Sequence, residues 1–217
     1  PERWEVLSNP GFENGASRDE KRATGSSAIP GWLRAAGEGI DIAVDDSQAF
    51  EGRQSLRLKN RQDGAAAWVR SEPFDPPDTG RIAVLVRLKG NNSRRQPNLR
   101  LAIEGRLHGQ VYYRFATVGA GKDSPPLKTE WAQYILPIDD LPMEGLSDLR
   151  VGFDLMGGGA AYIDDVQVYK LWFLEDERRE LLKSIAMADF QRDKGKLAEC
   201  QQFVDGYWPQ FLREHVL

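Results

Sequence analysis

The chain has 217 residues, of which 41% are hydrophobic and 29% charged, and its formal net charge at pH 7 is -4. A chain of this size and composition is expected to be globular, and its acidic balance argues against a nucleic-acid or anionic-membrane surface. No apolar run reaches the roughly 18 residues that a membrane-spanning helix needs, and the single Cys200 excludes an internal disulfide.

Strand patterns fill residues 1–170. Apolar and polar residues alternate over short stretches separated by turn-forming residues, as in Arg81–Lys89, whose apolar residues would share one face. About nine such strands without intervening helices predict a mainly β, antiparallel sandwich or barrel. A turn is expected at 30–32, and the expected strands are Trp4–Leu7, Ile40–Val44, parts of 51–60 and 65–74, Arg81–Lys89, Asn98–Glu104, Gln110–Val118, Trp131–Ile138, Leu149–Leu155 and Ala160–Tyr169.

The last of these strands, Ala160–Tyr169, carries an acid among apolar residues. Asp164 shares its parity with Val166 and Val168, so the pleat is expected to aim its carboxylate at the apolar side. A buried carboxylate must be protonated, paired or bound to a cation. Glu13, in the turn-rich opening of the chain, suits an oxygen-ligand cation site. We therefore expect the two acids to meet around one calcium ion.

A helical period replaces the strand pattern after Tyr169. Apolar residues recur at helical spacing from Leu174 to Ala188, with three acids that favour a helix N-terminus. Gly195 is a natural stop, and a second stripe follows in which Pro209 should kink or restart the helix. We expect a sandwich at 1–170 and an amphipathic helical hairpin at 171–217, which must pack on the sandwich, on a second copy or on another domain.

Several stretches follow in order along the chain: NPGFENG, PGW, AFEGRQSLRL, SEPF, TEWAQYILPI and AYIDDVQVY. Over roughly residues 5–170 they resemble the jelly-roll carbohydrate-binding modules appended to xylanases and β-glucanases, of the galactose-binding-like type. The resemblance implies an antiparallel jelly-roll β-sandwich in an exported bacterial protein. The chain begins at Pro1 rather than Met and shows no signal peptide, so we expect an excised domain. Its periplasmic or extracellular location is what the resemblance implies.

The resemblance also implies a structural calcium site between the start of the chain, a turn near residue 52 and the last strand. Calcium takes about six to eight oxygen ligands, from carboxylates and carbonyls alike. The alternative is that Glu13 and Asp164 cap turns or pair with an arginine such as Arg53. The implied ligands are the carbonyl groups of Gly11 and Gln54 and the carboxylates of Glu13, Glu51 and Asp164.

Modules of this kind stack a pyranose on an aromatic ring of the concave sheet and bond its hydroxyl groups with polar side chains. Trp68 matches the stacking tryptophan, with Arg70 on the same parity. Tyr112 and Tyr113 lie in the strand of the second aromatic residue, and the sequence leaves open which of them points outward. The other polar candidates share the polar parity of Asn98–Glu104. The implied ligand-binding residues are Trp68, Arg70, Arg100, Glu104, Tyr112 and Tyr113.

No catalytic constellation is singled out. His108 and His215 are the only histidines, no serine is marked as a partner, and none of the 33 acids is distinguished as a glycosidase pair. We expect a non-catalytic, calcium-stabilised module that binds a poly- or oligosaccharide. The alternative is a structural or protein-interaction domain of a larger exported protein, whose helical tail contacts a second copy or another domain.

Overall fold

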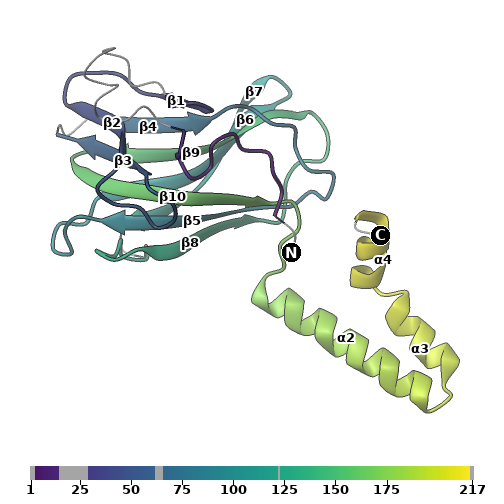
Figure 1. Cartoon of the computed structure of the whole chain (residues 1–217). Coiled ribbons are helices and arrows are strands. Elements are labelled where there is room, and N and C mark those ends of the chain that lie inside the picture. Colours follow the sequence, from purple (N-terminus) through teal and green to yellow (C-terminus); the bar gives the residue numbers. More distant parts are fainter. Residues whose placement is uncertain (1–2, 15–28, 62–65, 122, 216–217) are drawn as a thin grey trace. The chain divides into compact units, whose positions relative to one another are not determined.

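The computed structural model describes residues 3–14, 29–61, 66–121 and 123–215. The chain divides into two units, residues 1–170 and residues 171–217. The first unit is built of strands and the second of helices (Figure 1).

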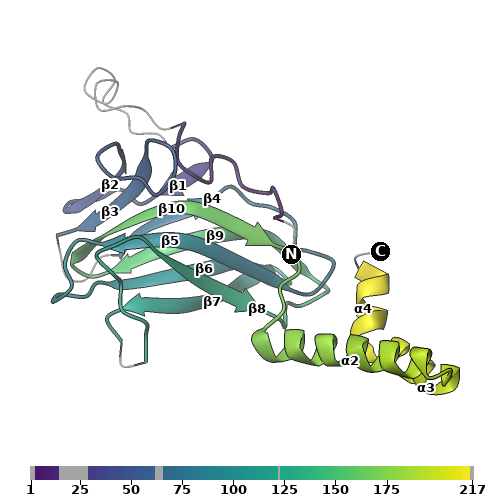
Figure 2. The ribbon, with the colours of Figure 1, turned by 60° about the horizontal axis from the view of Figure 1, so that its bottom comes forward.

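Within the described part of the first unit, ten strands form two antiparallel five-stranded sheets. The strand order is β1-β4-β9-β6-β7 in one sheet and β2-β3-β10-β5-β8 in the other. The axes of the strands in the two sheets are roughly aligned, as in an aligned sandwich, while neighbouring strands point in opposite directions (Figure 1, Figure 2). Their bounds are β1 Trp32–Arg34, β2 Ile40–Asp45, β3 Ser55–Asn60, β4 Ala66–Ser71, β5 Ile82–Gly90, β6 Asn98–Leu107, β7 Gln110–Gly119, β8 Ala132–Ile138, β9 Leu146–Met156 and β10 Gly159–Tyr169.

The core lies between the two sheets and follows the period-2 alternation of the strands. In β6, Leu99, Leu101 and Ile103 are buried in it, while the polar residues between them face outward. This arrangement confirms the mainly β, jelly-roll class predicted from the sequence. The turn expected at 30–32 leads directly into β1, whose Trp32 stacks on Phe12 at 5.1 Å between ring centroids.

Two local predictions about the sandwich are wrong. Residues 4–7 form no strand, although the Trp4 N–H donates to the Val168 carbonyl at 2.7 Å. The parity of β10 is also interrupted, because its register against β5 shifts between Asp164 and Gln167. Ile163 and Val166 therefore both enter the core, and Asp164 lies on the outer side of its sheet.

The described part of the second unit contains three helices rather than the expected pair: α2 Glu175–Asp193, α3 Leu197–Val204 and α4 Tyr207–His215. Gly195, with φ 72°, ends α2 as predicted. The second apolar stripe, expected to form one helix, is divided into α3 and α4 at Asp205–Gly206. Pro209 lies in the first turn of α4, where proline is tolerated. No residue of α2 or α3 is buried. None of the described helices is long and apolar enough to cross a membrane.

Candidate functional site

The outer face of the β1-β4-β9-β6-β7 sheet gathers most of the predicted ligand-binding residues. Trp68 and Arg70 alternate with buried residues of β4, and Arg100 and Glu104 do so in β6. In β7, Tyr113 is paired with Glu104 and shares its face. Tyr112 instead packs against the core, and its role as a ligand-binding residue stays a prediction.

A guanidinium group occupies the middle of this face. Arg70 Nε donates to Glu104 Oε2 at 2.6 Å, and Arg70 Nη2 donates to Asp154 Oδ1 at 2.8 Å. Its Nη1 donates to the carbonyl groups of the two flanking core residues, Val69 and Phe153. Because most of its donors are used in this way, Arg70 holds the two carboxylates in place across three strands.

The absence of a side chain at Gly152 makes room for this arginine. A Cβ atom at Gly152 would lie 2.7 Å from Arg70 Cδ, closer than real Cβ contacts. Gly152 is paired with Arg70 on one side and with Ala102 on the other. The Arg70 side chain therefore fills the space above Gly152, and both Gly152 and Ala102 are buried.

The electrostatics of this cluster follow from burial and from Asp154. Burial lowers the pKa of Arg70, but the hydrogen bond to Glu104 and the charge of Asp154 outweigh it, and the pKa lies above its ordinary value. Tyr113 donates its hydroxyl to Asp154 Oδ2 at 2.6 Å. Burial, together with the bond to Asp154 and its charge, raises the pKa of Tyr113 to about 12. Tyr113 is thus a neutral hydrogen-bond donor at physiological pH.

Two partly exposed aromatic rings flank the cluster. Trp68 on β4 is 37% exposed and Phe115 on β7 is 45% exposed. The guanidinium carbon of Arg100 lies 4.4 Å from the Phe115 ring centroid, which orients that ring. Strands β9 and β6 separate the two aromatic residues. Three strand spacings amount to about 14 Å, which several linked sugar residues can span.

Sequence reasoning missed Phe115 and Asp154. Phe115 shares the parity of Tyr113, so the alternation would have revealed it once the outward tyrosine was known. Asp154 is only 5% exposed and stands between two core residues, Phe153 and Leu155. Because Asp154 alternates with these core residues, the sequence predicts an outward acid there and gives no sign of its burial.

A second acidic site lies on the outer side of β10. Asp164 is fully buried, and it accepts the backbone N–H groups of Phe50 at 2.7 Å, Glu51 at 3.2 Å and Asp165 at 2.7 Å. Asp165 has φ 47°, and this kink of the bulge turns its N–H toward the Asp164 carboxylate. Burial raises the pKa of Asp164, while these backbone bonds act in the opposite direction.

Glu13 belongs to the same site. Its Oε1 accepts the backbone N–H groups of Arg53 at 2.9 Å and Gln54 at 3.0 Å. The contact with Arg53 that the sequence offered as an alternative is thus made by the backbone. A cavity of about 370 Å³ is lined by four of the five predicted metal ligands, and Gln54 does not line it. The four are Gly11, Glu13, Glu51 and Asp164.

The remaining lining residues of this cavity are Arg3, Gly52 and Asp165, so its carboxylate oxygens, which suit a hard cation, stand beside one cationic side chain. Asp164 forms no ion pair with any described side chain, although it is fully buried. Over the described residues, no three acidic, histidine or cysteine side chains lie close enough to hold a metal by themselves. A cation here would therefore be held by Glu13 and Asp164 together with backbone carbonyl groups, a mixture that calcium accepts.

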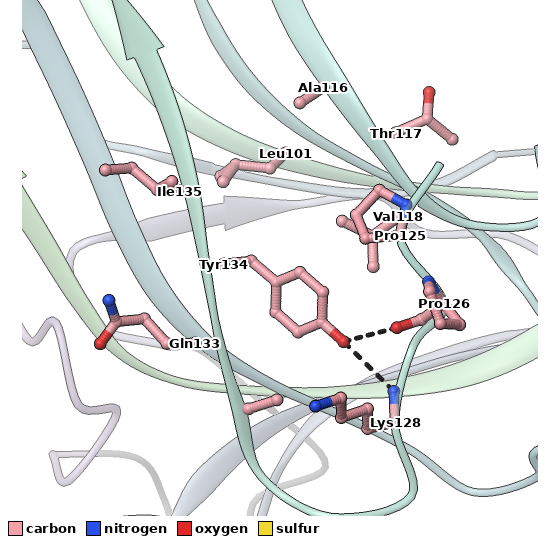
Figure 3. A pocket seen from close by; sticks show the side chains of 11 residues that line it. Leu101, Ala116, Thr117, Val118, Pro125, Pro126, Lys128, Gln133, Tyr134 and Ile135 are labelled. Atoms are coloured by element: carbon pink, nitrogen blue, oxygen red, sulfur yellow. Dashed lines mark hydrogen bonds between the residues drawn. The ribbon is translucent and has the colours of Figure 1, made fainter. Parts of the chain in front are cut away.

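An apolar crevice of about 460 Å³ opens where β7 and β8 border the two sheets. Figure 3 shows Tyr134 at its centre, where the hydroxyl donates to the Pro126 carbonyl at 2.7 Å and accepts the Lys128 N–H at 3.2 Å. The hydroxyl is thus already used within the protein. The crevice continues the core through Leu101 and Val118.

No protein-family model matches the sequence, and the search of curated proteins finds no match. Solved structures do match. Family 16 carbohydrate-binding module-2 is 14% identical with a TM-score of 0.51, and the match covers 76% of this chain and 99% of that chain. The N-terminal CBM22-1–CBM22-2 tandem domain of Xyn10C from Paenibacillus barcinonensis is 14% identical with a TM-score of 0.51, over 77% of this chain and 46% of that chain.

The same fold also occurs as a part of enzymes. The arabinose-bound MgGH51 α-L-arabinofuranosidase is 11% identical with a TM-score of 0.52, and the match covers 75% of this chain but 26% of the enzyme. Identities this low show the fold alone. The fold resemblance predicted from the sequence, to jelly-roll carbohydrate-binding modules, is therefore confirmed.

Proposed function

We propose that the sandwich is a non-catalytic carbohydrate-binding module whose ligand lies on the outer face of the β1-β4-β9-β6-β7 sheet. The observation that carries the proposal is the pairing of two partly exposed aromatic rings, Trp68 and Phe115, with fixed polar groups between them. A pyranose has an apolar face that stacks on a ring and hydroxyl groups that need hydrogen-bonding partners. Similar solved structures that carry saccharide-binding names support this choice.

The separation of the rings indicates an oligosaccharide. Because Trp68 and Phe115 stand on β4 and β7, a ligand that touches both must run across the strands. Its middle residues would lie over the Arg70–Glu104 pair, where the partly exposed Glu104 can accept hydrogen bonds from hydroxyl groups. Arg70 acts there as a positioning residue, because its bonds fix the orientation of Glu104 and Asp154.

The same arrangement supports a binding role over catalysis. A glycosidase needs two carboxyl groups that face each other across a gap holding the scissile bond or a water molecule. Glu104 and Asp154 instead share the guanidinium group of Arg70. We therefore propose that the module is not catalytic. We also propose that it belongs to an exported protein, because polysaccharides are found outside the cell.

Calcium is the second element of the proposal. Glu13 and Asp164 would hold it with their carboxylates, aided by Glu51 and by the carbonyl groups of Gly11 and Gln54, of which Gly11 lines the cavity. The ion would offset the buried charge of Asp164 and tie the start of the chain to β10. Its role is structural, because Asp164 and the ligand face lie on different sheets.

The sugar proposal is tested by affinity electrophoresis in gels that contain neutral polysaccharides. We expect retardation of the full chain in at least one gel, and its loss in Trp68→Ala and Phe115→Ala, because each variant removes a stacking surface worth about 1 kcal/mol or more. Met143→Ala is the matched control, since Met143 is an exposed apolar residue in the loop between β8 and β9. Retardation that survives in both aromatic variants, or none in any gel, contradicts the proposal.

The helical unit supports a second candidate function, contact with a partner protein or a second copy. Leu182, Ile185 and Phe190 of α2 are each about half exposed, which places three large apolar side chains in contact with water on one helix. We expect Leu182→Ser and Ile185→Ser to reduce any association seen by sedimentation velocity. A monomer at all concentrations for both the parent chain and the variants contradicts self-association.

A further inference from the structure

A polar pocket of about 400 Å³ lies at one end of the sandwich, away from both sites described above. It is formed where β3 ends, where the loop after β5 begins and where β9 turns into β10. Its volume is within the range of pockets that hold small ligands. The lining residues are Lys59, Asn60, Arg61, Asn91, Asn92, Arg95, Gly158, Gly159 and Ala160.

The lining carries three cationic side chains and no acid, although acids outnumber bases in the chain as a whole. Lys59, Arg61 and Arg95 form no ion pair with any other residue that the structure describes. The acid across the strand pair from Lys59 is Asp41, and its carboxylate already accepts from Arg57 Nη2 at 2.9 Å. The positive charge of the pocket is therefore not neutralised by the surrounding described residues.

Amide groups supply a second kind of contact. Asn92 Oδ1 accepts the backbone N–H groups of Arg94 at 2.8 Å and Arg95 at 3.3 Å, an Asx turn that fixes the orientation of the side chain. With its oxygen used in this way, the amide nitrogen of Asn92 is the group left to donate. A ligand that fits would offer acceptor oxygens as well as negative charge.

The lining contains no aromatic residue. Single-stranded nucleic acids are held mainly by base stacking on aromatic rings, so the pocket lacks the feature that they need. A carboxylate flanked by hydroxyl groups matches what is present, because cations bind the carboxylate and amides bind the hydroxyl oxygens.

We propose that this pocket binds the carboxylate-bearing unit of an acidic saccharide, a uronic acid residue. The site is separate from the aromatic face, so the inference goes beyond the neutral-sugar site proposed above. A chain with both sites would bind a polysaccharide that carries acidic units along with neutral ones.

The test compares trigalacturonate with its methyl ester, which has the same rings without the charge, by calorimetric titration of the full chain. We expect the ester to bind about tenfold more weakly or worse, because charge-assisted hydrogen bonds are lost. The double variant Lys59→Gln/Arg61→Gln should lose trigalacturonate binding to the same degree. The control Lys183→Gln/Arg213→Gln changes net charge equally, in the helices, and should bind as the parent does.

Further measurements distinguish binding at this pocket from binding at the aromatic face, and binding of a uronic acid from binding of other anions. Trp68→Ala should lose neutral oligosaccharides yet keep trigalacturonate, so the two proposals fail independently. If the double variant has lost its native circular dichroism, Arg95→Gln, in an exposed loop, replaces it with a smaller expected loss. Equal binding of acid and ester, or unchanged binding in these variants, overturns the proposal. It is also overturned if inorganic sulfate, phosphatidylserine vesicles or a single-stranded oligonucleotide binds more tightly than trigalacturonate.

Discussion

Asp154 and Asp164 are two buried acids on the outer sides of the two sheets, and they are stabilised in different ways. Asp154 on β9 is bonded to a guanidinium group and to a tyrosine hydroxyl. Asp164 on β10 is bonded to three backbone N–H groups and, among the described side chains, to no cation. Burial costs the charged form free energy in both places, so each acid needs a compensating partner.

The difference indicates what each region is suited to do. Around Asp154 the compensating charge belongs to the chain, and the resulting cluster is rigid, partly exposed and placed between two aromatic rings. Around Asp164 the backbone provides only dipoles, next to a second carboxylate and a cavity. The first region suits a neutral ligand with hydroxyl groups, whereas the second suits a cation.

The largest expected effect on stability comes from removing the guanidinium group of Arg70, which is hydrogen-bonded to Asp154. Arg70→Met should lower the free energy of unfolding by about 3 kcal/mol, because it leaves a buried carboxylate without its cation. The measurement is the midpoint and slope of urea unfolding. Arg70→Met/Asp154→Leu should lose less than the single variant, since no unpaired charge remains.

Arg94→Met is the matched control, because the Arg94 side chain is exposed. It should change the free energy of unfolding by less than about 0.5 kcal/mol. If Arg70→Met and Arg94→Met unfold at the same urea concentration, Asp154 does not depend on Arg70 for its charge.

Asp154 and Asp164 also show how much of the structure could be predicted from the sequence. Strands such as β5 and β6 were predictable because apolar residues alternate along them with a period of two, and β7 because of its aromatic residues. Asp164 was rightly predicted to be buried, but for the wrong reason. The bulge at Asp164–Gln167 reverses the parity, and the chain near Gly11 and Phe50 covers the acid.

The candidate ligand face was predictable only in part. Arg100 and Glu104 follow from alternation against Leu99, Leu101 and Ile103, whereas the choice between Tyr112 and Tyr113 needed the pairing register of β7 with β6. The role of Arg70 could not be predicted, because it depends on Gly152 and Asp154 of a strand about 80 residues later. Long-range pairings of this kind leave no local pattern in the sequence.

The second-largest expected effect concerns the calcium ion proposed at Asp164, which Asp154 should not need. Chelation with EDTA should lower the thermal midpoint of the full chain, and calcium should restore it. An ion present at about 100 times its Kd stabilises the folded state by about 2.7 kcal/mol. Asp164→Asn should abolish this response, whereas Asp154→Asn should retain it, because only Asp164 lines the cavity with Glu13.

Asp46→Asn controls for the loss of one negative charge near this region, since Asp46 is exposed. A thermal midpoint that is the same with EDTA and with excess calcium would mean that backbone dipoles alone stabilise Asp164. The two acids would then differ in their partners but not in any need for an ion.

The smallest effect is the pH dependence that Asp164 gives the protein in EDTA. Burial raises its pKa in the folded state, so between the unfolded pKa of about 4 and that raised pKa the folded chain binds more protons than the unfolded chain. The free energy of unfolding contributed by this group therefore falls as pH rises through the interval. Asp164→Asn should lack this fall, which is measured as the difference between the two proteins in urea unfolding from pH 3 upward. The three backbone N–H bonds keep the effect small because they already favour the carboxylate. With calcium bound, the free energy of unfolding contributed by Asp164 should instead rise with pH, since the ion binds the deprotonated group. Parallel pH profiles of the parent and Asp164→Asn in EDTA would rule out this role of Asp164.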